Sequence, residues 1–283
     1  FKCEVVDPFL AACRSGQTPN PCVLCNRSFK FAHLLALARK LKCNKVATGH
    51  YARIVRRQGG FALLEAIDRT KDQSYFLARL SQKELAKTLL PLGTKTKRQT
   101  FALAKRFKIP LDPAIYKESQ DLCFIPEKSP AQFLRRHITD ATPGPFKTWD
   151  GTTVGMHEGI PFYTIGQRRG LQIGGQKNPL HVVSIDQKNN TIFVAPSSAL
   201  YASEVRIHSI NFTRQPLQGK KGIPLSARIR ARAEKKRGTF IFSHHQGIFL
   251  FISPVSAVTP GQVLVPYRGK EIVGSGLIAP IPP

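Results

Sequence analysis

The chain carries the sequence TPNPCVLCNRSFKF at residues 18–31, and this segment decides how the first part of the chain folds. Two prolines flank Asn20 and hold the backbone extended there, so Asn20 itself cannot be helical. In residues 29–42 the apolar side chains recur with a helical period, and a helix is therefore expected to begin after Asn26. The segment predicts an extended stretch that leads into a helix.

Cys22 and Cys25 form a C-x2-C pair within this segment. Because the expected helix places Cys25 near its N-terminus, the positive end of the helix dipole favours the thiolate and lowers the thiol pKa. The charges of Arg27 and Lys30 act in the same direction. The pair predicts a reactive cysteine, while an inert pair and half of a zinc site share its spacing. No second C-x2-C or H-x3-H follows to complete a zinc site.

The rest of the chain divides into an α/β part followed by two β-rich parts. Strands are expected at 45–55 and 61–67, and helices at 72–80, 81–93, 97–108 and 130–138. From 142–145 (Thr-Pro-Gly-Pro) onward, glycine and proline are dense and helical periodicity is lost. Short β-type runs follow at 181–185, 191–195, 204–210, 225–233, 238–243, 247–252 and 262–267, the last five as a small barrel or sandwich. The predicted fold class is multidomain α/β plus β, with domains at 1–138, 139–200 and 201–283.

Composition restricts the partner and the compartment. The 283 residues include 43 Lys and Arg against 17 Asp and Glu, a formal charge of +26, which favours a polyanion such as nucleic acid. A membrane surface fits less well, because no basic amphipathic helix is visible and no apolar run approaches the roughly 20 residues that span a bilayer. Six cysteines are too sparse for a disulfide scaffold, so a reduced, cytoplasmic setting is expected. If 225–233 is one strand, Arg228, Arg230 and Arg232 share a face that suits RNA.

The start of the chain carries its own expectation. The chain begins at Phe1, its only methionine is Met156, and residues 1–10 do not have the pattern of a secretory signal. We therefore expect this sequence to be the C-terminal portion of a longer protein.

Several motifs together resemble the tRNA-specific 2-thiouridylase family. They are TPNPCVLCNRSFKF (18–31), ATGHYAR (47–53), KDQSYFLARL (71–80), ESQDLCFIPE (118–127), GIPFYTIGQRRGL (159–171) and VTPGQ (258–262). They occur in the family's order and extend over nearly the whole chain. The resemblance implies a partial ATP-binding α/β domain of the PP-loop type, a small central β-rich domain and a C-terminal β-barrel that binds tRNA.

The same resemblance implies ATP-dependent transfer of sulfur to carbon 2 of the wobble uridine in tRNAs for Lys, Glu and Gln. Cys123 would carry the persulfide, and Cys25 would be the nucleophile that releases the sulfur and forms a disulfide with Cys123. ATP, with Mg²⁺, would be the cofactor, and no permanent metal is expected. The sulfur donor would be a relay protein or a cysteine desulfurase.

Further site residues follow from motif matching. Asn20, Pro21 and Cys22 would line the pocket for the target base, and Gly49 would approach ATP where a side chain would interfere. Contacts with tRNA are implied for His50, Lys71, Asp72, Gln73, Arg230, Ala231 and Gln262. From the residue alone, the favoured interpretation of His50 is an interior histidine with its hydrogen bonds satisfied.

Two departures keep alternatives open. The family's ATP loop, a strand followed by an SGGxDS-type turn, does not occur in this sequence, so a non-catalytic tRNA-binding remnant is one alternative. The other is an iron–sulfur or zinc protein, because Cys22 adds a third thiol to Cys25 and Cys123.

Overall fold

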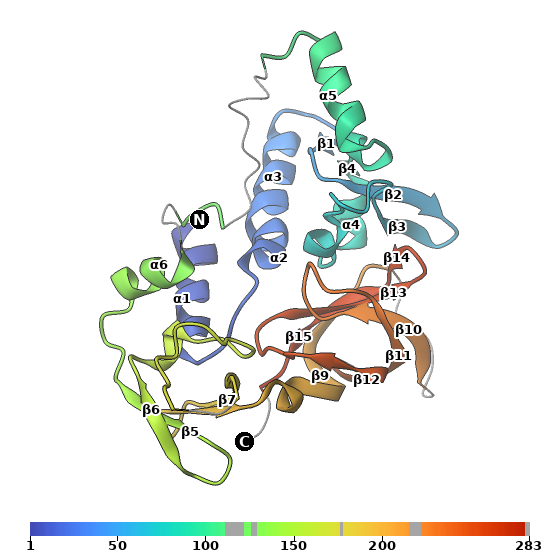
Figure 1. The fold of residues 1–283 in the computed structure, drawn as a ribbon. Helices are drawn as coiled ribbons and strands as arrows, with labels where there is room; N and C mark the ends of the chain where they lie inside the picture. Colours follow the sequence, from blue (N-terminus) through green and yellow to red (C-terminus); the bar gives the residue numbers. More distant parts are fainter. Residues whose placement is uncertain (111–121, 126–128, 176–177, 215–221, 281–283) are drawn as a thin grey trace.

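The structure is a computed structural model that describes residues 1–110, 122–125, 129–175, 178–214 and 222–280. Figure 1 shows three parts: helices with short strands, a small sheet below α1 and α6, and a barrel. The predicted multidomain α/β plus β class is confirmed, including the central β-rich part and the C-terminal barrel.

The N-terminal part is helical around a minimal parallel sheet. Its helices are α1 (Asp7–Arg14), α2 (Pro21–Cys25), α3 (Ala32–Lys40), α4 (Gln82–Ala86) and α5 (Lys97–Arg106). Its strands are β1 (Val46–Ala47), β2 (Ala52–Arg57), β3 (Gly60–Glu65) and β4 (Thr88–Leu89), with β1 parallel to β4. Capping boxes begin α4 at Ser81 and α5 at Thr96, because each hydroxyl accepts from the third residue of its helix.

Four sequence predictions need correction in this part. The helix predicted to begin after Asn26 begins at Pro21 and continues through a π-helical stretch, Asn26–Phe31, into α3. The strand predicted for 45–55 is interrupted by the turn at 48–51. The helix predicted at 72–80 is one 3-10 turn, Ser74–Leu77, and the helix that opens at Ser81 ends at Ala86.

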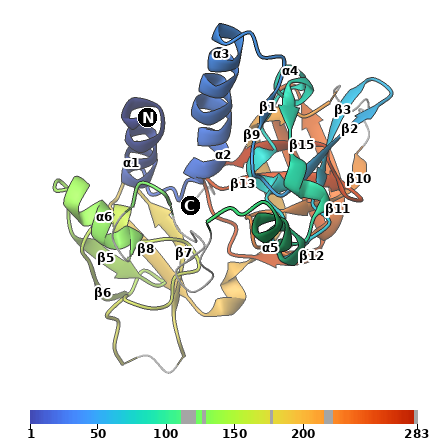
Figure 2. The same cartoon turned by 90° about the horizontal axis from the view of Figure 1, so that it is seen from above.

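The central part is a four-stranded sheet in the order β6-β5-β8-β7. Its strands are β5 (Gly144–Lys147), β6 (Thr153–His157), β7 (His181–Asp186) and β8 (Thr191–Ala195). Before it comes α6 (Pro130–His137), which begins as predicted with Ser129 as N-cap and a proline in its first turn. α6 packs on α1 through Phe133 and Leu134, so the two helices lie together beside the central sheet (Figure 2).

The C-terminal part is a closed barrel of six strands. They are β9 (Tyr201–Phe212), β10 (Ile223–Arg228), β11 (Lys236–Ser243), β12 (Gln246–Ser256), β13 (Val263–Arg268) and β15 (Gly274–Ile278). The pairing of β10 with β13 closes the circle. The predicted strand 225–233 is too long: β10 ends at Arg228, so Arg230 and Arg232 lie in the following turn and the three arginines do not share a strand face.

The N-terminal part and the barrel are joined through a common sheet and a common core. Strand β14 (Glu271–Ile272) pairs with β3, so the β2–β3 hairpin extends the barrel sheet. Tyr75 and Leu77 are buried together with Val263 and Tyr267 of the barrel. Residues far apart in sequence are therefore held rigidly relative to one another at this junction.

Among the described residues, no helix is both long and apolar enough to cross a membrane.

Candidate functional site

A segment at residues 16–20, called here the junction segment, meets all three parts of the molecule just before α2. Thr18 uses every polar group it has: its N–H donates to Pro260 O (2.9 Å), its carbonyl accepts from Gln262 Nε2 (2.7 Å), and its hydroxyl donates to Thr164 Oγ1 (3.1 Å). Pro260 and Gln262 belong to the barrel, and Thr164 to the central part. Thr18 therefore fixes where α2 begins.

Two glycines allow the chains to approach this closely. At Gly16 (φ +71°) a Cβ would lie 2.8 Å from Ile185 Cγ2 of the central sheet. At Gly261 (φ +87°) a Cβ would lie 3.1 Å from Gln17 Cβ and 3.3 Å from Pro19 N. Only glycine combines a left-handed backbone with such contacts, so the VTPGQ turn supports the junction segment from behind.

Asn20 starts α2 and is extended, as predicted. Its φ and ψ are −106° and 88°, and its Oδ1 accepts from Val23 N at 3.3 Å as a helix N-cap. Asn20 also hydrogen-bonds the hydroxyl of Tyr75, which donates to Val263 O of the barrel at 2.7 Å. Pro21 is the first helical residue and is buried, which leaves Cys22 and Cys25 one helical turn apart on one side of α2.

The three cysteines singled out from the sequence influence one another electrostatically. The Cys22 thiol interacts with Cys25 and Cys123, and the Cys25 thiol interacts with Cys123. All six cysteines of the chain have free thiols. Cys22 and Cys25 are partly buried, whereas Cys123 is exposed. The three thiols, called here the cluster, therefore lie near enough to influence one another's charge.

The predicted fall in the thiol pKa at Cys25 is wrong. Burial raises the pKa of Cys25 above its ordinary value of 9.0, although the Lys30 charge and a backbone hydrogen bond from Lys30 oppose the rise. Burial raises the pKa of Cys22 in the same way. Since α2 begins at Pro21, Cys25 lies a full turn inside the helix, where the dipole of the helix end is weak. Arg27 is not among the causes of the shift.

Cys123 is held by the residues that follow it. Phe124 packs edge-on against Phe9 (5.4 Å between ring centroids) and Phe133 (5.5 Å), and Ile125 is buried in the same cluster. These contacts with α1 and α6 hold the backbone and leave the Cys123 side chain exposed. Cys13 is buried in this cluster, where burial raises its pKa to about 12, as suits a structural residue.

His50 and Gly49 lie in the turn between β1 and β2. His50 Nδ1 is 2.8 Å from Thr48 Oγ1, and its ring stacks on Phe31, the last residue of the π-helical stretch between α2 and α3. Burial and the charge of Lys30 lower the pKa of His50 to about 4, so the ring is neutral at physiological pH. Gly49 is exposed, and a Cβ there would meet only Leu92 Cδ1, at 3.8 Å. One face of the turn is therefore open.

The KDQ segment at 71–73 lies beside that turn, because Gln73 Oε1 accepts from Tyr51 N (2.9 Å) and Gln73 N donates to Tyr51 O (2.7 Å). Lys71 is partly exposed. Asp72 is different, since its side chain is 3% exposed and bonds Ala66 N, Ser74 and Arg228. The carboxylate of Asp72 therefore organises the loop from inside, which places the predicted tRNA contact on its neighbours.

A buried ion network, which sequence reasoning missed, links this loop to the barrel. Arg228 binds Asp72 (3.4 Å) and Glu65 (3.1 Å), and Lys235 binds Glu65 (2.8 Å). Arg228 and Lys235 also lie over the ring of Tyr267, at 5.4 and 4.9 Å from its centroid. No local sequence pattern predicts the three ion pairs, because each joins residues more than 150 positions apart.

The remaining residues predicted to contact tRNA are on the barrel, and two of them contact the N-terminal part. Arg230 is exposed in the turn after β10, while Ala231 is partly buried against the shared core. Gln262 bonds Thr18 O, so its side-chain amide already holds the junction segment. Gln262 and Asp72 thus have hydrogen-bond partners within the protein, whereas the side chain of Arg230 is exposed.

Metal binding can be tested against the arrangement of donors. Within the described part of the chain, no group of three His, Cys, Asp or Glu side chains is placed to hold a metal ion. The thiols of Cys22, Cys25 and Cys123 are accordingly not placed as the ligand set of an iron–sulfur cluster or a zinc ion in this structure. At Gly49 the turn leaves space beside its backbone, because only Leu92 Cδ1 lies near the position of a Cβ.

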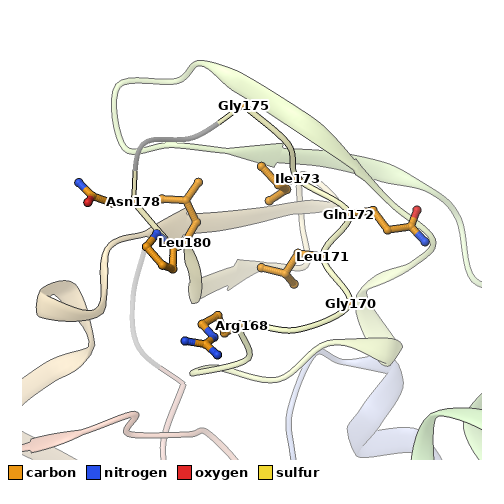
Figure 3. A pocket seen from close by; sticks show the side chains of 9 residues that line it. Arg168, Gly170, Leu171, Gln172, Ile173, Gly175, Asn178 and Leu180 are labelled. Carbon is orange, nitrogen blue, oxygen red and sulfur yellow. The ribbon is translucent and has the colours of Figure 1, made fainter.

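A separate hollow of about 440 Å³ lies in the central part, along the loop that contains GQRRGL (Figure 3). Its lining mixes the apolar side chains of Leu171, Ile173 and Leu180 with the polar side chains of Arg168, Gln172 and Asn178. It contains none of the thiols, so it is not the centre of the cysteine chemistry.

Comparison with known proteins assigns each part of the chain. The tRNA methyl transferase HUP domain model matches residues 1–127, and the tRNA methyl transferase PRC-barrel domain model matches residues 131–196. The aminomethyltransferase beta-barrel domain model matches residues 202–278. Together the three matches cover nearly the whole chain.

Curated relatives carry one name. The tRNA-specific 2-thiouridylase MnmA of Chloroflexus aurantiacus is 39% identical over 283 residues, which is 99% of this chain and 77% of that protein. Those of Pelotomaculum thermopropionicum and Bacillus pumilus are 36% and 38% identical, over 98% and 97% of this chain and 76% and 74% of those proteins. Three family models match consecutive parts of the chain, and these relatives are 36–39% identical to it over nearly all of its length. The chain therefore belongs to the tRNA-specific 2-thiouridylase family.

Proposed function

We propose that this chain transfers sulfur from a cysteine persulfide to carbon 2 of the wobble uridine of tRNA, in a reaction that uses ATP. The observation that carries the proposal is that Cys22 and Cys25 lie on one side of α2 and both interact electrostatically with the exposed Cys123. The names of the relatives support the same reaction class.

Two cysteines suffice for the transfer. A donor protein first leaves a persulfide, Cys123–S–SH, on the exposed thiol. Its terminal sulfur attacks carbon 2 of the activated uridine, the activated oxygen leaves, and one proton is released. The Cys25 thiolate then attacks Cys123 Sγ and breaks the S–S bond. The bond's electron pair leaves on the sulfur attached to carbon 2, which gives 2-thiouridine and a Cys25–Cys123 disulfide.

Other residues would place the base and the nucleotide. Asn20, Pro21 and Cys22 stand at the start of α2 beside the thiols, where a flipped-out uracil would enter. ATP, with Mg²⁺, would supply the group that activates the uridine oxygen, and Gly49 would face it across the open turn. Lys30, whose charge acts on Cys22, Cys25 and His50, would favour the thiolate during attack.

The partner would be tRNA for Lys, Glu or Gln, in the cytoplasm. The net charge of +26 supports a polyanionic partner. Exposed Arg230, together with Lys71 and His50 around the KDQ loop, would contact it. The sulfur would come from a relay protein or a cysteine desulfurase.

The test uses the complete protein with tRNA, ATP and a persulfide donor, and measures 2-thiouridine by mass spectrometry of digested tRNA. Cys25→Ser and Cys123→Ser should each abolish the product and leave tRNA affinity within about twofold of the unaltered protein. Cys43→Ser is the matched control, because Cys43 is exposed and lies outside the cluster; it should keep full activity.

Two outcomes would contradict the proposal. If either cluster variant still makes 2-thiouridine, its cysteine is wrongly assigned. If the unaltered protein binds tRNA and never thiolates it, the chain is a non-catalytic tRNA-binding protein.

A further inference from the structure

Two arginines between the helical part and the barrel have no acidic partner. Arg27 lies in the π-helical stretch Asn26–Phe31, and Arg79 follows the 3-10 turn Ser74–Leu77. Arg79 is only 9% exposed, and Arg27 is partly buried. Neither side chain forms an ion pair with any residue that the structure describes. Because buried guanidinium groups are normally paired with a carboxylate, this pair lacks the partner that such groups need.

One short segment of the barrel holds both guanidinium groups. Arg79 Nη1 donates to Ser209 O (3.1 Å), and Arg27 Nη1 donates to Asn211 Oδ1 (3.2 Å). Ser209 and Asn211 both belong to β9, where residues two positions apart are at most about 7 Å from one another. The two arginines are therefore neighbours whose like charges repel. In agreement with this, burial and the charge of Arg27 lower the pKa of Arg79 to about 10.

A β-bulge shapes this segment of the barrel. Between His208 and Asn211, three steps along β9 oppose two steps along β15. Ser209 lies in the bulge and has a left-handed backbone (φ +52°). A bulge turns backbone groups out of the regular ladder, which lets the Ser209 carbonyl reach the arginine. Ser275 Oγ of β15 donates to the carbonyl of the residue before Arg79 (3.2 Å), so both strands fix the position of this arginine.

Both arginines keep donors that no described residue uses. Nε and Nη2 of Arg79 have no partner in the described part of the chain, and neither atom is sealed from solvent. The same holds for Nε and Nη2 of Arg27. Asn211 Nδ2 is buried without an acceptor among the described residues. A surplus of donors and positive charge without a carboxylate is the chemistry of an anion site.

We propose that Arg27 and Arg79 together bind one phosphate group of the RNA strand that carries the target uridine. The proposal rests on the proposed function. Each guanidinium group presents parallel N–H donors that match two phosphate oxygens. The phosphate supplies the negative charge that the two arginines do not find among the described residues.

The location suits the backbone next to a flipped-out base. Arg27 lies two residues after Cys25, in the helix whose start is proposed to receive the uracil. Asn26 Nδ2 donates to Phe76 O (3.1 Å), which joins this helix to the turn that leads from the KDQ loop to Arg79. Phosphate contacts hold the register of a nucleic acid without reading its sequence. The pair can therefore hold the strand in place while one base leaves its stack.

The first measurement is the affinity of the complete protein for tRNA over a series of KCl concentrations. Arg79→Met should lower the affinity by about tenfold and reduce the log–log salt slope by about one, because one phosphate contact is lost. Arg79→Lys keeps the charge and should keep the slope while losing part of the affinity. Arg27→Gln should reproduce the smaller slope at a partly exposed position, where the substitution disturbs folding less.

Arg206→Met is the matched control. It removes one positive charge from the same strand, but Arg206 is 67% exposed and already pairs with Glu204 at 2.8 Å. Its affinity should stay within about twofold of that of the unaltered protein, with the same slope. A substitution that only disturbed the fold would weaken binding equally at every salt concentration and leave the slope unchanged.

The second measurement identifies the source of the phosphate. In steady-state thiolation by the complete protein, Arg79→Met should raise KM for tRNA and leave KM for ATP unchanged. A rise in KM for ATP alone would assign the site to the nucleotide and overturn the proposal.

The outcomes separate this proposal from the one on which it rests. If the unaltered protein neither binds tRNA nor makes 2-thiouridine, the proposed function fails. If it does both, and Arg79→Met and Arg27→Gln have the salt slope of Arg206→Met, the phosphate site is refuted and the sulfur transfer stands.

Discussion

At the scale of the residue, burial and the charge of Lys30 act in opposite directions on the pKa of the Cys25 thiol. Burial raises this pKa, Lys30 lowers it, and the effect of burial is the larger. The family resemblance identifies the cysteine, but the direction of its pKa follows from its surroundings, which the sequence does not display. A thiol whose pKa is raised in this way keeps its proton to a higher pH, and the protonated form is the less reactive one.

The raised pKa predicts the pH dependence of Cys25 alkylation. Because the thiolate is the reactive form, iodoacetamide should modify Cys25 more slowly than the same cysteine in a free peptide of residues 18–31 at pH 8. The rate in the protein should continue to rise above pH 9, where the peptide levels off. Lys30→Gln should shift the profile further upward, since it removes a charge that favours the thiolate. Alkylation followed by peptide mass spectrometry measures both, and coincident protein and peptide profiles would contradict the burial argument.

At the scale of the element, the junction segment and the VTPGQ turn act as one support for α2. Gly261→Ala should move residues 17–19, because its Cβ would lie 3.1 Å from Gln17 Cβ. We expect kcat for thiolation to fall while tRNA affinity stays unchanged, and unfolding in urea to show a loss of about 1–2 kcal/mol.

Gly269→Ala is the matched control for this variant. Gly269 also has a left-handed backbone (φ +61°), but nothing lies within 4 Å of its Cβ position. It should show the loss in stability without the loss in kcat. Equal kcat values for the two variants would show that the VTPGQ turn does not support α2.

The elements that were predicted correctly are those with local signals. The capping box at Ser81 and the Ser129-Pro130 start of α6 need only their own few residues. The predicted start of the helix was wrong because proline is compatible with two local structures. It can hold an extended chain or, as Pro21 does, occupy the first turn of a helix. The predicted strand was too long because β10 ends where its pairing with β11 and β13 ends, with Ala227 opposite Lys236 and Arg228 opposite Val265.

At the scale of the whole molecule, the sequence predicts three parts but not how they are joined. The motifs single out the candidate site residues, including the cysteines and the KDQ loop, and their roles stay predictions. The residues that assemble it, such as Thr18, Tyr75 and Arg228, act through contacts with distant segments. Such contacts depend on the packing of three domains and leave no periodic pattern in the chain.

The ion network around Arg228 is one of the contacts that connect distant segments, and its loss should lower the free energy of unfolding of the whole protein. Arg228→Met leaves the Asp72 carboxylate, which is 3% exposed, without an ion-pair partner among the described residues. An uncompensated buried charge costs about 3–5 kcal/mol, which urea unfolding can measure. Arg214→Met is the control, because its pair with Glu271 is 32% and 22% exposed and should contribute about 1 kcal/mol or less. If the two variants lose equal stability, burial does not strengthen the Arg228 network, and the barrel is held to the KDQ loop by the shared apolar core instead.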